Sequence, residues 1–214
     1  MEELLAKLNR QIHQSTQTRF KLSDLKYETA HEMLYKCYLA EVYKRGVTPV
    51  EDQRTQEKVA KVAKWLTGDH KPGLLMYGSQ CGTGKTTMAR AICNLIGLLF
   101  DSCVSSERKA VYRVTAIDLA KMYSESPERY KSMVNQELLF IDDIGTEPAN
   151  LKIYGNEFSP VTELLYNRYD RLKWTIATSN LDDNQIKERY GERIDDRLRE
   201  MFDKIHFQGK SYRK

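Results

Sequence analysis

The sequence contains no apolar run long enough to cross a membrane. A spanning helix needs about 20 consecutive apolar residues, and no run in these 214 residues approaches that length. Two glutamates follow the first methionine, so the start of the chain lacks the basic-then-apolar order of a secretory signal. Together these absences favour a cytoplasmic protein that does not contact a membrane.

Cysteine is scarce and shows no metal-binding or redox spacing. The four cysteines are Cys37, Cys81, Cys93 and Cys103. No two of them have C-x-x-C spacing, which argues against a zinc site and against a redox dithiol. Reduced thiols in the cytosol are the expected state of these residues.

The chain also lacks a strong charge imbalance. It has 34 lysines and arginines against 30 aspartates and glutamates, a formal net charge of +4. Such mild basicity is compatible with nucleic-acid binding but does not by itself indicate it. Internal repeats and low-complexity tracts are absent too, and a chain of 214 residues is long enough for one full core with a small appendage.

The most informative motif that is present is a glycine-rich turn. The apolar run 74–77 predicts a short buried strand, and GTGKTT follows at 82–87, where it opens a helical pattern. Glycines let successive backbone N–H groups face one point, and the helix N-terminus adds a positive dipole. In such a P-loop, Lys85 would reach the β- and γ-phosphates of a nucleotide and the Thr86 hydroxyl would bind Mg²⁺. The candidate phosphate-binding residues are Gly78, Ser79, Gly82, Thr83, Gly84, Lys85, Thr86 and Thr87.

One position departs from the strict P-loop pattern. That pattern has glycine where this chain has Ser79, and Gly78 lies one residue earlier. We expect the turn to form nevertheless, because Gly82 and Gly84 remain. The alternative is a chance glycine loop without a ligand, which the second half of the site makes less attractive.

That second half is a pair of carboxylates after a second apolar run. The run 138–141 predicts a strand buried on both faces, as in a parallel sheet. Asp142 and Asp143 follow at its C-terminal end, where open α/β sheets bind their ligands. Asp142 would hold Mg²⁺, through water, and Asp143 would orient or deprotonate an attacking water. The alternative is a strand that simply ends in a polar turn.

A third predicted strand, 174–178, also ends in polar residues. An adjacent parallel strand would bring Asn180 near the γ-phosphate and the attacking water, where an amide can both donate and accept hydrogen bonds. Alternatively, Asn180, Asp182 or Asp183 caps the helix that carries Ile186. The two roles are compatible with each other.

The segment 190–199 is dense in arginine. It is either a solvated, salt-bridged helix or the source of an arginine finger, a guanidinium that reaches the γ-phosphate bound by a neighbouring subunit. The residues alone do not distinguish Arg193 from Arg197 as the finger.

Strand and helix patterns alternate from residue 74 onward, which predicts a parallel sheet covered by helices on both faces. The expected strands are 74–77, 111–114, 138–141, 174–178 and 204–207, and the expected helices are 51–66, 85–98, 116–123, 160–172 and one or two within 182–200. We predict a loop over or beside the active site at 145–159. Residues 1–48 form a helical N-terminal region that either packs on the main domain, 49–214, or docks a partner.

The motifs GTGKTT, LLFIDDIG, TIATSNL and YGERIDDRL, in this order, resemble those of the DnaC/IstB-type branch of the AAA+ ATPases over about residues 50–214. The resemblance implies an α/β P-loop core with a parallel five-stranded sheet. It places Lys85 and Thr86 in Walker A, and Asp142 and Asp143 in Walker B. It places Asn180 at sensor 1 and Arg197 at the arginine finger, with Arg193 second. Only about a dozen residues follow Phe202, so we expect the C-terminal helical lid of many AAA+ proteins to be absent.

The same resemblance implies a function. A bacterial or phage-encoded ATPase would use ATP and Mg²⁺ between subunits of a ring or spiral to deliver a replicative helicase to single-stranded DNA. Its N-terminal region would bind the helicase. One alternative is an ATP-dependent helper of a transposase, and another is a nucleotide-gated adaptor with little turnover.

Overall fold

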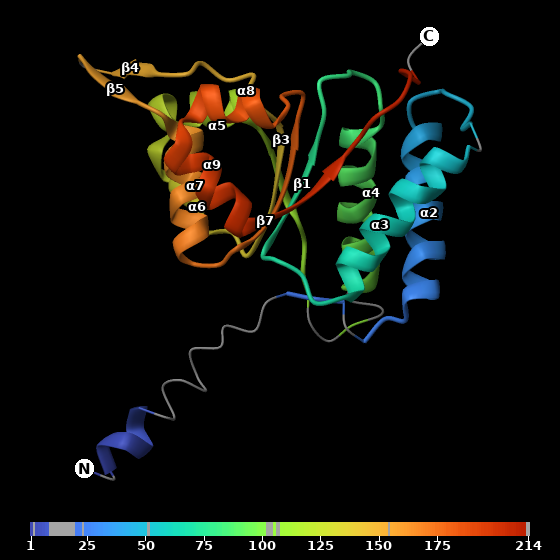
Figure 1. The fold of residues 1–214 in the computed structure, drawn as a ribbon, viewed down its shortest axis with the longest axis horizontal. Helices are drawn as coiled ribbons and strands as arrows, with labels where there is room; N and C mark the ends of the chain where they lie inside the picture. Colours follow the sequence, from blue (N-terminus) through green and yellow to red (C-terminus); the bar gives the residue numbers. More distant parts are fainter. Residues whose placement is uncertain are drawn as a thin grey trace.

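The fold is a parallel β-sheet between two layers of helices (Figure 1). The computed structural model describes residues 1, 3–8, 20–22, 24–50, 52–101, 105, 108–153 and 155–212. The five strands of the sheet are β1 (Gly73–Tyr77), β2 (Tyr112–Thr115), β3 (Leu138–Ile144), β6 (Trp174–Ser179) and β7 (Phe202–His206). They lie in the order β2-β3-β6-β1-β7, and every neighbouring pair is parallel. The predicted fold class is therefore confirmed.

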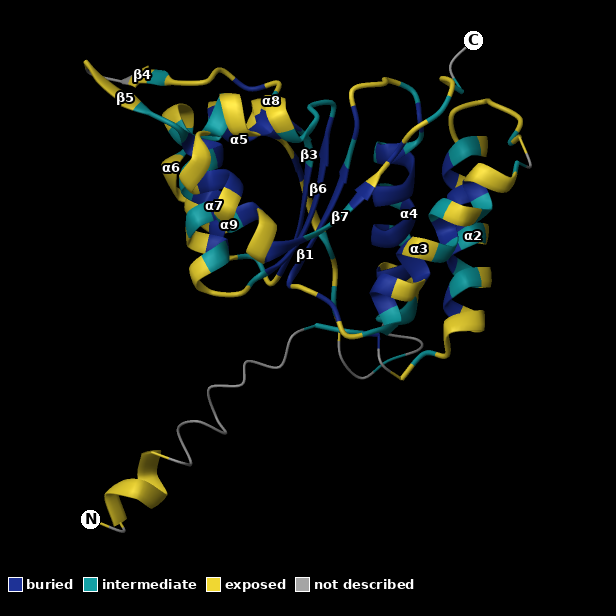
Figure 2. Ribbon diagram, in the orientation of Figure 1, coloured by how far each residue is buried: buried dark blue, intermediate teal, exposed yellow. Residues whose placement is uncertain are grey.

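The central strands β1, β3 and β6 are largely buried on both faces, as their apolar runs predict, whereas the edge strand β2 exposes Tyr112, Arg113 and Thr115. Alternate residues of β1 point to opposite sides: Leu74 belongs to one apolar cluster and Leu75 to the other. β6 is buried along its whole length, and the central strands β1, β3 and β6 are mainly dark blue in Figure 2. A strand covered on both faces has no polar side to present to solvent, which explains why these segments lack alternation.

Two sets of helices cover the two faces (Figure 1). One layer consists of α2 (Tyr27–Tyr43), α3 (Gln53–Thr67) and α4 (Lys85–Leu99). The other consists of α5 (Ala116–Glu125), α6 (Pro127–Asn135), α7 (Pro160–Asp170), α8 (Asp183–Tyr190) and α9 (Glu192–Met201). None of the described helices combines the length and the apolar composition that crossing a membrane requires.

Helix α2 is part of the main core. Its buried residues Ala30, Leu34, Cys37 and Tyr38 recur at helical spacing and belong to the same apolar cluster as α3 and α4. The predicted N-terminal helix therefore packs on the main domain over the residues of α2.

Of the cysteines, Cys37 and Cys93 are buried and free, Cys81 is exposed and free, and Cys103 lies outside the described residues.

The structure corrects the loop predicted at 145–159. This segment contains an antiparallel hairpin of β4 (Leu151–Ile153) and β5 (Asn156–Phe158), which extends away from the sheet (Figure 1). Gly155 lies between the two strands with φ +84°, a conformation that glycine adopts without steric cost. Strands of three residues are too short to show an alternating pattern in the sequence.

Helix α6 was not predicted from periodicity. It begins at Pro127, which occupies the first helical turn, where its missing N–H is not needed. Tyr130 and Val134, one turn apart, are its buried residues. Two apolar positions in a nine-residue helix are too few to distinguish it from a loop.

A fully buried arginine joins the second layer to the sheet. Arg168 of α7 donates hydrogen bonds to the carbonyl oxygens of Val134 (3.1 Å), Gln136 (2.8 Å), Glu137 (3.5 Å) and Trp174 (2.7 Å). Its Nε also donates to the Thr175 hydroxyl at 2.9 Å. Burial lowers the pKa of this guanidinium to about 9. The side chain thus satisfies backbone acceptors at the turn before β3 and at the start of β6.

Replacing Arg168 by methionine should lower the free energy of unfolding by about 3 kcal/mol or more, because four carbonyl groups would lose a buried donor. Urea denaturation followed by circular dichroism measures the effect. The control is Lys121→Met on the exposed surface of α5, which should change stability by about 0.5 kcal/mol or less. Equal stability of the two variants would contradict the anchoring role.

Candidate active site

The glycine-rich turn connects β1 to the first turn of α4. Gly78, Gly82 and Gly84 have φ values of +141°, +77° and +94°. A Cβ atom built at Gly78 would lie 3.0 Å from the His206 ring and 3.0 Å from the Phe207 carbonyl oxygen. The left-handed conformation thus falls on Gly78 rather than on Ser79, so a serine at 79 does not obstruct the turn.

Lys85 begins α4 and is buried inside this loop. Its Nζ donates to the carbonyl oxygens of Gly78 (2.9 Å) and Gln80 (2.8 Å). The following Thr86 is half-buried, whereas Thr83 and Thr87 are buried. An ammonium group at the start of a helix, next to a glycine-rich turn, is suited to charge-assisted hydrogen bonds with phosphate oxygens.

An oxygen-rich cluster joins α4 to the ends of two strands. The Thr86 hydroxyl donates to Asp142 Oδ1 at 2.9 Å, and the Thr178 hydroxyl donates to the same oxygen at 2.6 Å. The donor set of one hydroxyl and one carboxylate consists of hard oxygen ligands, the type that Mg²⁺ prefers. Mg²⁺ characteristically binds one or two protein ligands and completes its shell with phosphates and water, so Thr86 and Asp142 fit this ion.

Asp143 lies in a bulge of β3. Its φ is +57°, and the pairing register with β6 shifts between Ile141 and Ile144. A bulge re-aims one side chain, and a non-glycine residue in this conformation costs about 1–3 kcal/mol, a strain that clusters at functional sites. Asn180 Nδ2 donates to Asp143 Oδ1 at 3.2 Å. The structure therefore brings together the carboxylate near the end of β3 and the amide that follows β6.

The N-cap of α8 is Asp182 and not Asn180. Asp182 is the N-cap of this helix: its carboxylate accepts the Gln185 N–H at 2.9 Å, and the Gln185 side chain accepts the Asp182 N–H at 2.9 Å. Among the three residues considered, Asp182 is the cap.

Sequence reasoning missed the part that Thr178 plays. In addition to its bond to Asp142, this hydroxyl accepts the backbone N–H of Asp143 at 2.8 Å. One side chain of β6 thus contacts both consecutive aspartates of β3. In the sequence, the feature that could have indicated this role is that Thr178 is the first of the polar residues that end an otherwise apolar strand.

A second missed residue is Glu147, which is buried just after the aspartate pair. Its carboxylate accepts the Gly145 N–H at 2.8 Å and the hydroxyl of Tyr190, and it lies 3.7 Å from the Arg189 guanidinium. Burial is the main cause that raises the pKa of the Tyr190 hydroxyl, and the nearby Glu147 carboxylate raises it further. These contacts attach the turn that follows β3 to the end of α8.

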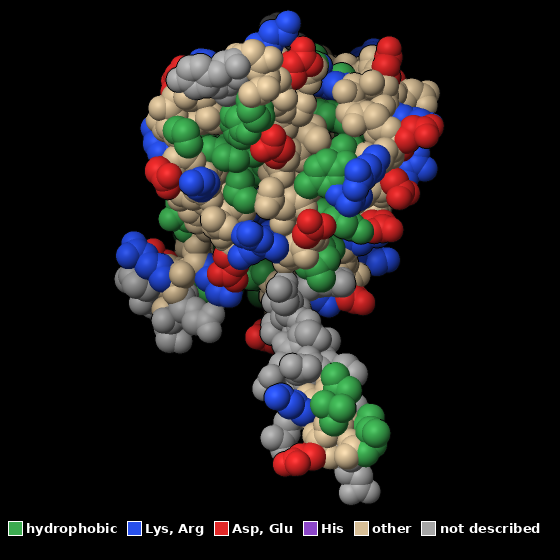
Figure 3. Space-filling view, turned by 90° about the vertical axis from the view of Figure 1, so that its left-hand side faces the viewer, with side chains coloured by type: hydrophobic (Ala, Val, Ile, Leu, Met, Phe, Trp, Pro, Cys, Tyr) green, Lys and Arg blue, Asp and Glu red, His purple; other side chains and the backbone are tan. Residues whose placement is uncertain are grey.

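Arg193 and Arg197 lie on a different part of the molecule. The Arg197 guanidinium lies 4.1 Å from the ring centroid of Tyr166 and 5.3 Å from that of Tyr169, and the Arg193 guanidinium lies 5.8 Å from Tyr166. Their ring partners are thus on α7, in the helical layer opposite α4. Figure 3 views the molecule from the side of that layer, where apolar patches alternate with charged side chains.

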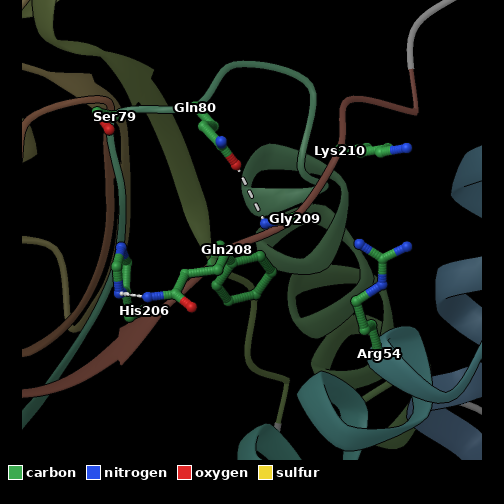
Figure 4. Close-up of a pocket in the computed structure, with 8 residues that line it drawn as sticks. Arg54, Ser79, Gln80, His206, Gln208, Gly209 and Lys210 are labelled. Atoms are coloured by element: carbon green, nitrogen blue, oxygen red, sulfur yellow. Dashed lines mark hydrogen bonds between the residues drawn. The ribbon is translucent and has the colours of Figure 1, made fainter.

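A cavity of about 510 Å³ adjoins the upstream half of the glycine-rich turn. Figure 4 shows Arg54 and Lys210 at one end and His206 and Gln208 at the other. It is lined by Arg54, Ser79, Gln80, His206, Phe207, Gln208, Gly209 and Lys210. Its size is within the range of small-molecule sites, and none of its lining residues carries a carboxylate.

Comparison with known proteins supports the nucleotide-binding interpretation. A sequence-family model described as the ATPase family associated with various cellular activities (AAA) matches residues 74–199. The crystal structure of DnaI is similar with a TM-score of 0.56 and 18% identity, over 78% of this chain and 88% of that chain. A candidate primosome component from Streptococcus pyogenes serotype M3 gives 0.51 and 20%, over 91% and 88%. At these identities the likeness shows a shared fold.

One curated protein is also similar. Protein SAV from Sulfolobus acidocaldarius is 26% identical over 138 residues, which cover 56% of this chain. The matched region spans only 16% of that protein, so the likeness concerns one part of a much longer chain.

Replacing Thr178 by valine should reduce the rate of ATP hydrolysis by about tenfold or more, because neither aspartate would keep its hydrogen bond to β6. Affinity for an ATP analogue should change by no more than about threefold, since the substitution leaves the turn before α4 intact. Steady-state kinetics and fluorescence titration separate the two effects. Thr162→Val on α7 is the matched control, and identical kinetics of both variants would refute the role of Thr178.

Proposed function

This chain belongs to the ATPase family associated with various cellular activities, and from that premise we propose that it hydrolyses ATP to load a replicative helicase onto single-stranded DNA. The observation that carries the ATPase part is the convergence of three segments at one edge of the sheet. Lys85 begins α4 after the loop that follows β1, Thr86 contacts Asp142 near the end of β3, and Asn180, which follows β6, contacts Asp143.

Each side chain has a distinct role in this proposal. The N–H groups of the turn and Lys85 bind the β- and γ-phosphates and neutralise the charge that develops on them. Thr86 and Asp142 would hold Mg²⁺, and the ion would supply further charge neutralisation. Asp143 positions the attacking water and accepts its proton as the γ-phosphate is cleaved from ADP. Asn180 holds Asp143 in place and donates to the γ-phosphate.

Arg197 acts on a neighbouring subunit in this proposal. It is half-buried and lies against Tyr166 and Tyr169 on the surface of α7, so its guanidinium is presented on the side of the fold away from α4. Head-to-tail contacts between copies build rings or open spirals. An arginine supplied in trans typically increases turnover by about 10³–10⁵. Arg193, one turn earlier on α9, is the second candidate.

The client is proposed from the family resemblance and from the described N-terminal residues. DnaC/IstB-type motifs imply helicase loading, and the similar Streptococcus structure is described as that of a candidate primosome component. Residues 3–8 are helical, and their leucines are exposed: Leu4, Leu5 and Leu8. Exposed leucines on a helix are suited to docking in a partner's groove. We therefore assign helicase docking to the beginning of the 1–48 region, before α2.

Hydrolysis between subunits has a kinetic signature. The specific ATPase activity should rise with protein concentration, because each site needs a neighbour. Lys85→Ala and Arg197→Ala should each be nearly inactive, and their mixture should recover part of the activity, since one type of mixed interface contains both intact groups. Coupled-enzyme assays of phosphate release measure this.

The matched control for that mixing experiment is Lys85→Ala with Asp143→Asn. Both changes affect groups of the same subunit's site, so no mixed interface is intact and no activity should return. Activity that is independent of concentration, or equal recovery in both mixtures, would contradict catalysis in trans.

Helicase loading is tested with purified components. The full chain, the host's replicative helicase and circular single-stranded DNA are combined with ATP, and the DNA-bound helicase is measured by sedimentation. We expect loading to depend on ATP and to be lost in a Leu4→Ser, Leu5→Ser, Leu8→Ser variant. Point substitutions are preferred to deletion of residues 1–48, because that deletion would also remove α2 and expose the apolar core on which it packs. ATP-dependent binding of a transposase in place of the helicase would move the function to transposition.

A further inference from the structure

The outer side of the glycine-rich turn is covered by the segment that follows β7. Residues 207–212 run along the end of β1 and the turn. The Phe207 N–H donates to the carbonyl oxygen of Tyr77, the last residue of β1, at 2.8 Å, and the Tyr212 N–H donates to the Gly82 carbonyl oxygen of the turn at 2.9 Å. The Gly209 N–H donates to the Gln80 side chain at 3.1 Å (Figure 4). This segment is called the brace.

Helix α3 fixes the end of the brace. The Tyr212 hydroxyl donates to Asp52 Oδ2 at 2.8 Å and shares a hydrogen bond of 3.1 Å with the Thr55 hydroxyl. Asp52 is itself the N-cap of α3, where it accepts the Thr55 N–H at 2.7 Å. The brace therefore lies between the turn and the first turn of α3.

Lys58, one turn further along α3, reaches the same place. Its Nζ donates to the Thr83 carbonyl oxygen at 3.1 Å. It also lies 5.1 Å from the ring centroid of Phe207 and 5.5 Å from that of Tyr212, within the range of cation–π attraction. The ammonium group thus lies between two aromatic rings of the brace and one carbonyl of the turn.

The contact between Lys58 and the Thr83 carbonyl also fixes the direction of the next backbone N–H group, because the peptide bond is planar. In a trans peptide the C=O of one residue and the N–H of the next point in opposite directions. Because Lys58 of α3 holds the Thr83 carbonyl, the Gly84 N–H points away from α3. In the same way, the Gly82 carbonyl held by the Tyr212 N–H directs the Thr83 N–H away from the brace.

We propose that Lys58 is a positioning residue for the phosphate-binding turn, which it holds, together with the brace, in the shape that presents its N–H groups to the phosphates of ATP. This inference rests on the proposed ATPase function and adds a residue that no P-loop motif contains. Lys58 lies behind the turn and does not contact the reacting atoms.

The electrostatic environment of Lys58 agrees with this position. Burial lowers its pKa below the ordinary lysine value, Asp52 raises it, and the positive charges of Arg54 and Lys85 lower it. Bound phosphates would offset the repulsion from Arg54 and Lys85, because opposite charge favours the protonated amine. Nucleotide binding and the charged state of Lys58 therefore support each other.

The test compares Lys58→Met, Lys58→Arg and the control Lys61→Met in the full chain. Methionine keeps the length of the side chain but removes the donor, so the Kd for a fluorescent ATP analogue should rise about tenfold. The kcat at saturating ATP should fall by a smaller factor than the affinity, because Lys85, Asp143 and Asn180 are unchanged. Arginine retains the donor and the ring contacts and should restore most of the affinity. Lys61, exposed on the same helix, should have no effect.

A second measurement follows the conformation of the turn without depending on ATP hydrolysis. Cys81 lies in the turn and is exposed, so its alkylation by iodoacetamide can be followed by mass spectrometry of the peptide that contains it. We expect Lys58→Met to increase this rate several-fold and to weaken its protection by ATP. Thermal unfolding of each variant shows whether the fold is retained, and Lys58→Arg serves if the methionine variant does not fold.

The outcomes separate the two proposals. A wild-type protein that neither binds nor hydrolyses ATP would refute the proposed function. If the wild type binds ATP and Lys58→Met binds it equally well with unchanged Cys81 reactivity, the positioning role is overturned while the ATPase stands. A loss confined to kcat would also overturn it, since positioning of the turn acts on binding.

Discussion

The parallel register of β1, β3 and β6 is the constraint on which the rest of the site depends. Because these strands pair side by side in one direction, the residues after them meet at a single edge of the sheet. The buried faces of the strands leave no freedom to slip, since a shift by one residue would reverse every side chain. Lys85, Asp142, Asp143 and Asn180 are brought together by this pairing rather than by their spacing in the sequence.

The polar groups at this edge are held by a network that extends beyond the residues of the motifs. Thr178 connects both aspartates to β6, and Glu147 connects the turn after them to α8. On the other side of the phosphate-binding turn, Lys58 and the brace bind the outward carbonyl groups. Because a peptide C=O and the following N–H point in opposite directions, holding these two carbonyls on one side directs the next N–H groups to the other side, where an anion can bind.

The second helical layer gives the molecule a different face. Arg193 and Arg197 lie there on aromatic rings, apart from the nucleotide site of the same chain. In the proposed mechanism Arg197 acts on the site of another copy, so the proposed catalysis and the proposed assembly are one inference. The exposed leucines before α2 would then be left for the client.

The sequence by itself determined the order of strands and helices, the glycine-rich turn and the residues at the strand ends, because buried parallel strands and P-loops have local signatures. It did not reveal α6, the β4–β5 hairpin, or the positions of Arg168, Thr178 and Lys58. The first two are too short for a periodic signal. Each of the three side chains bonds to a partner 25 or more residues away in the sequence: Arg168 to Val134, Thr178 to Asp142 and Lys58 to Thr83. Only tertiary packing brings such donors to their acceptors.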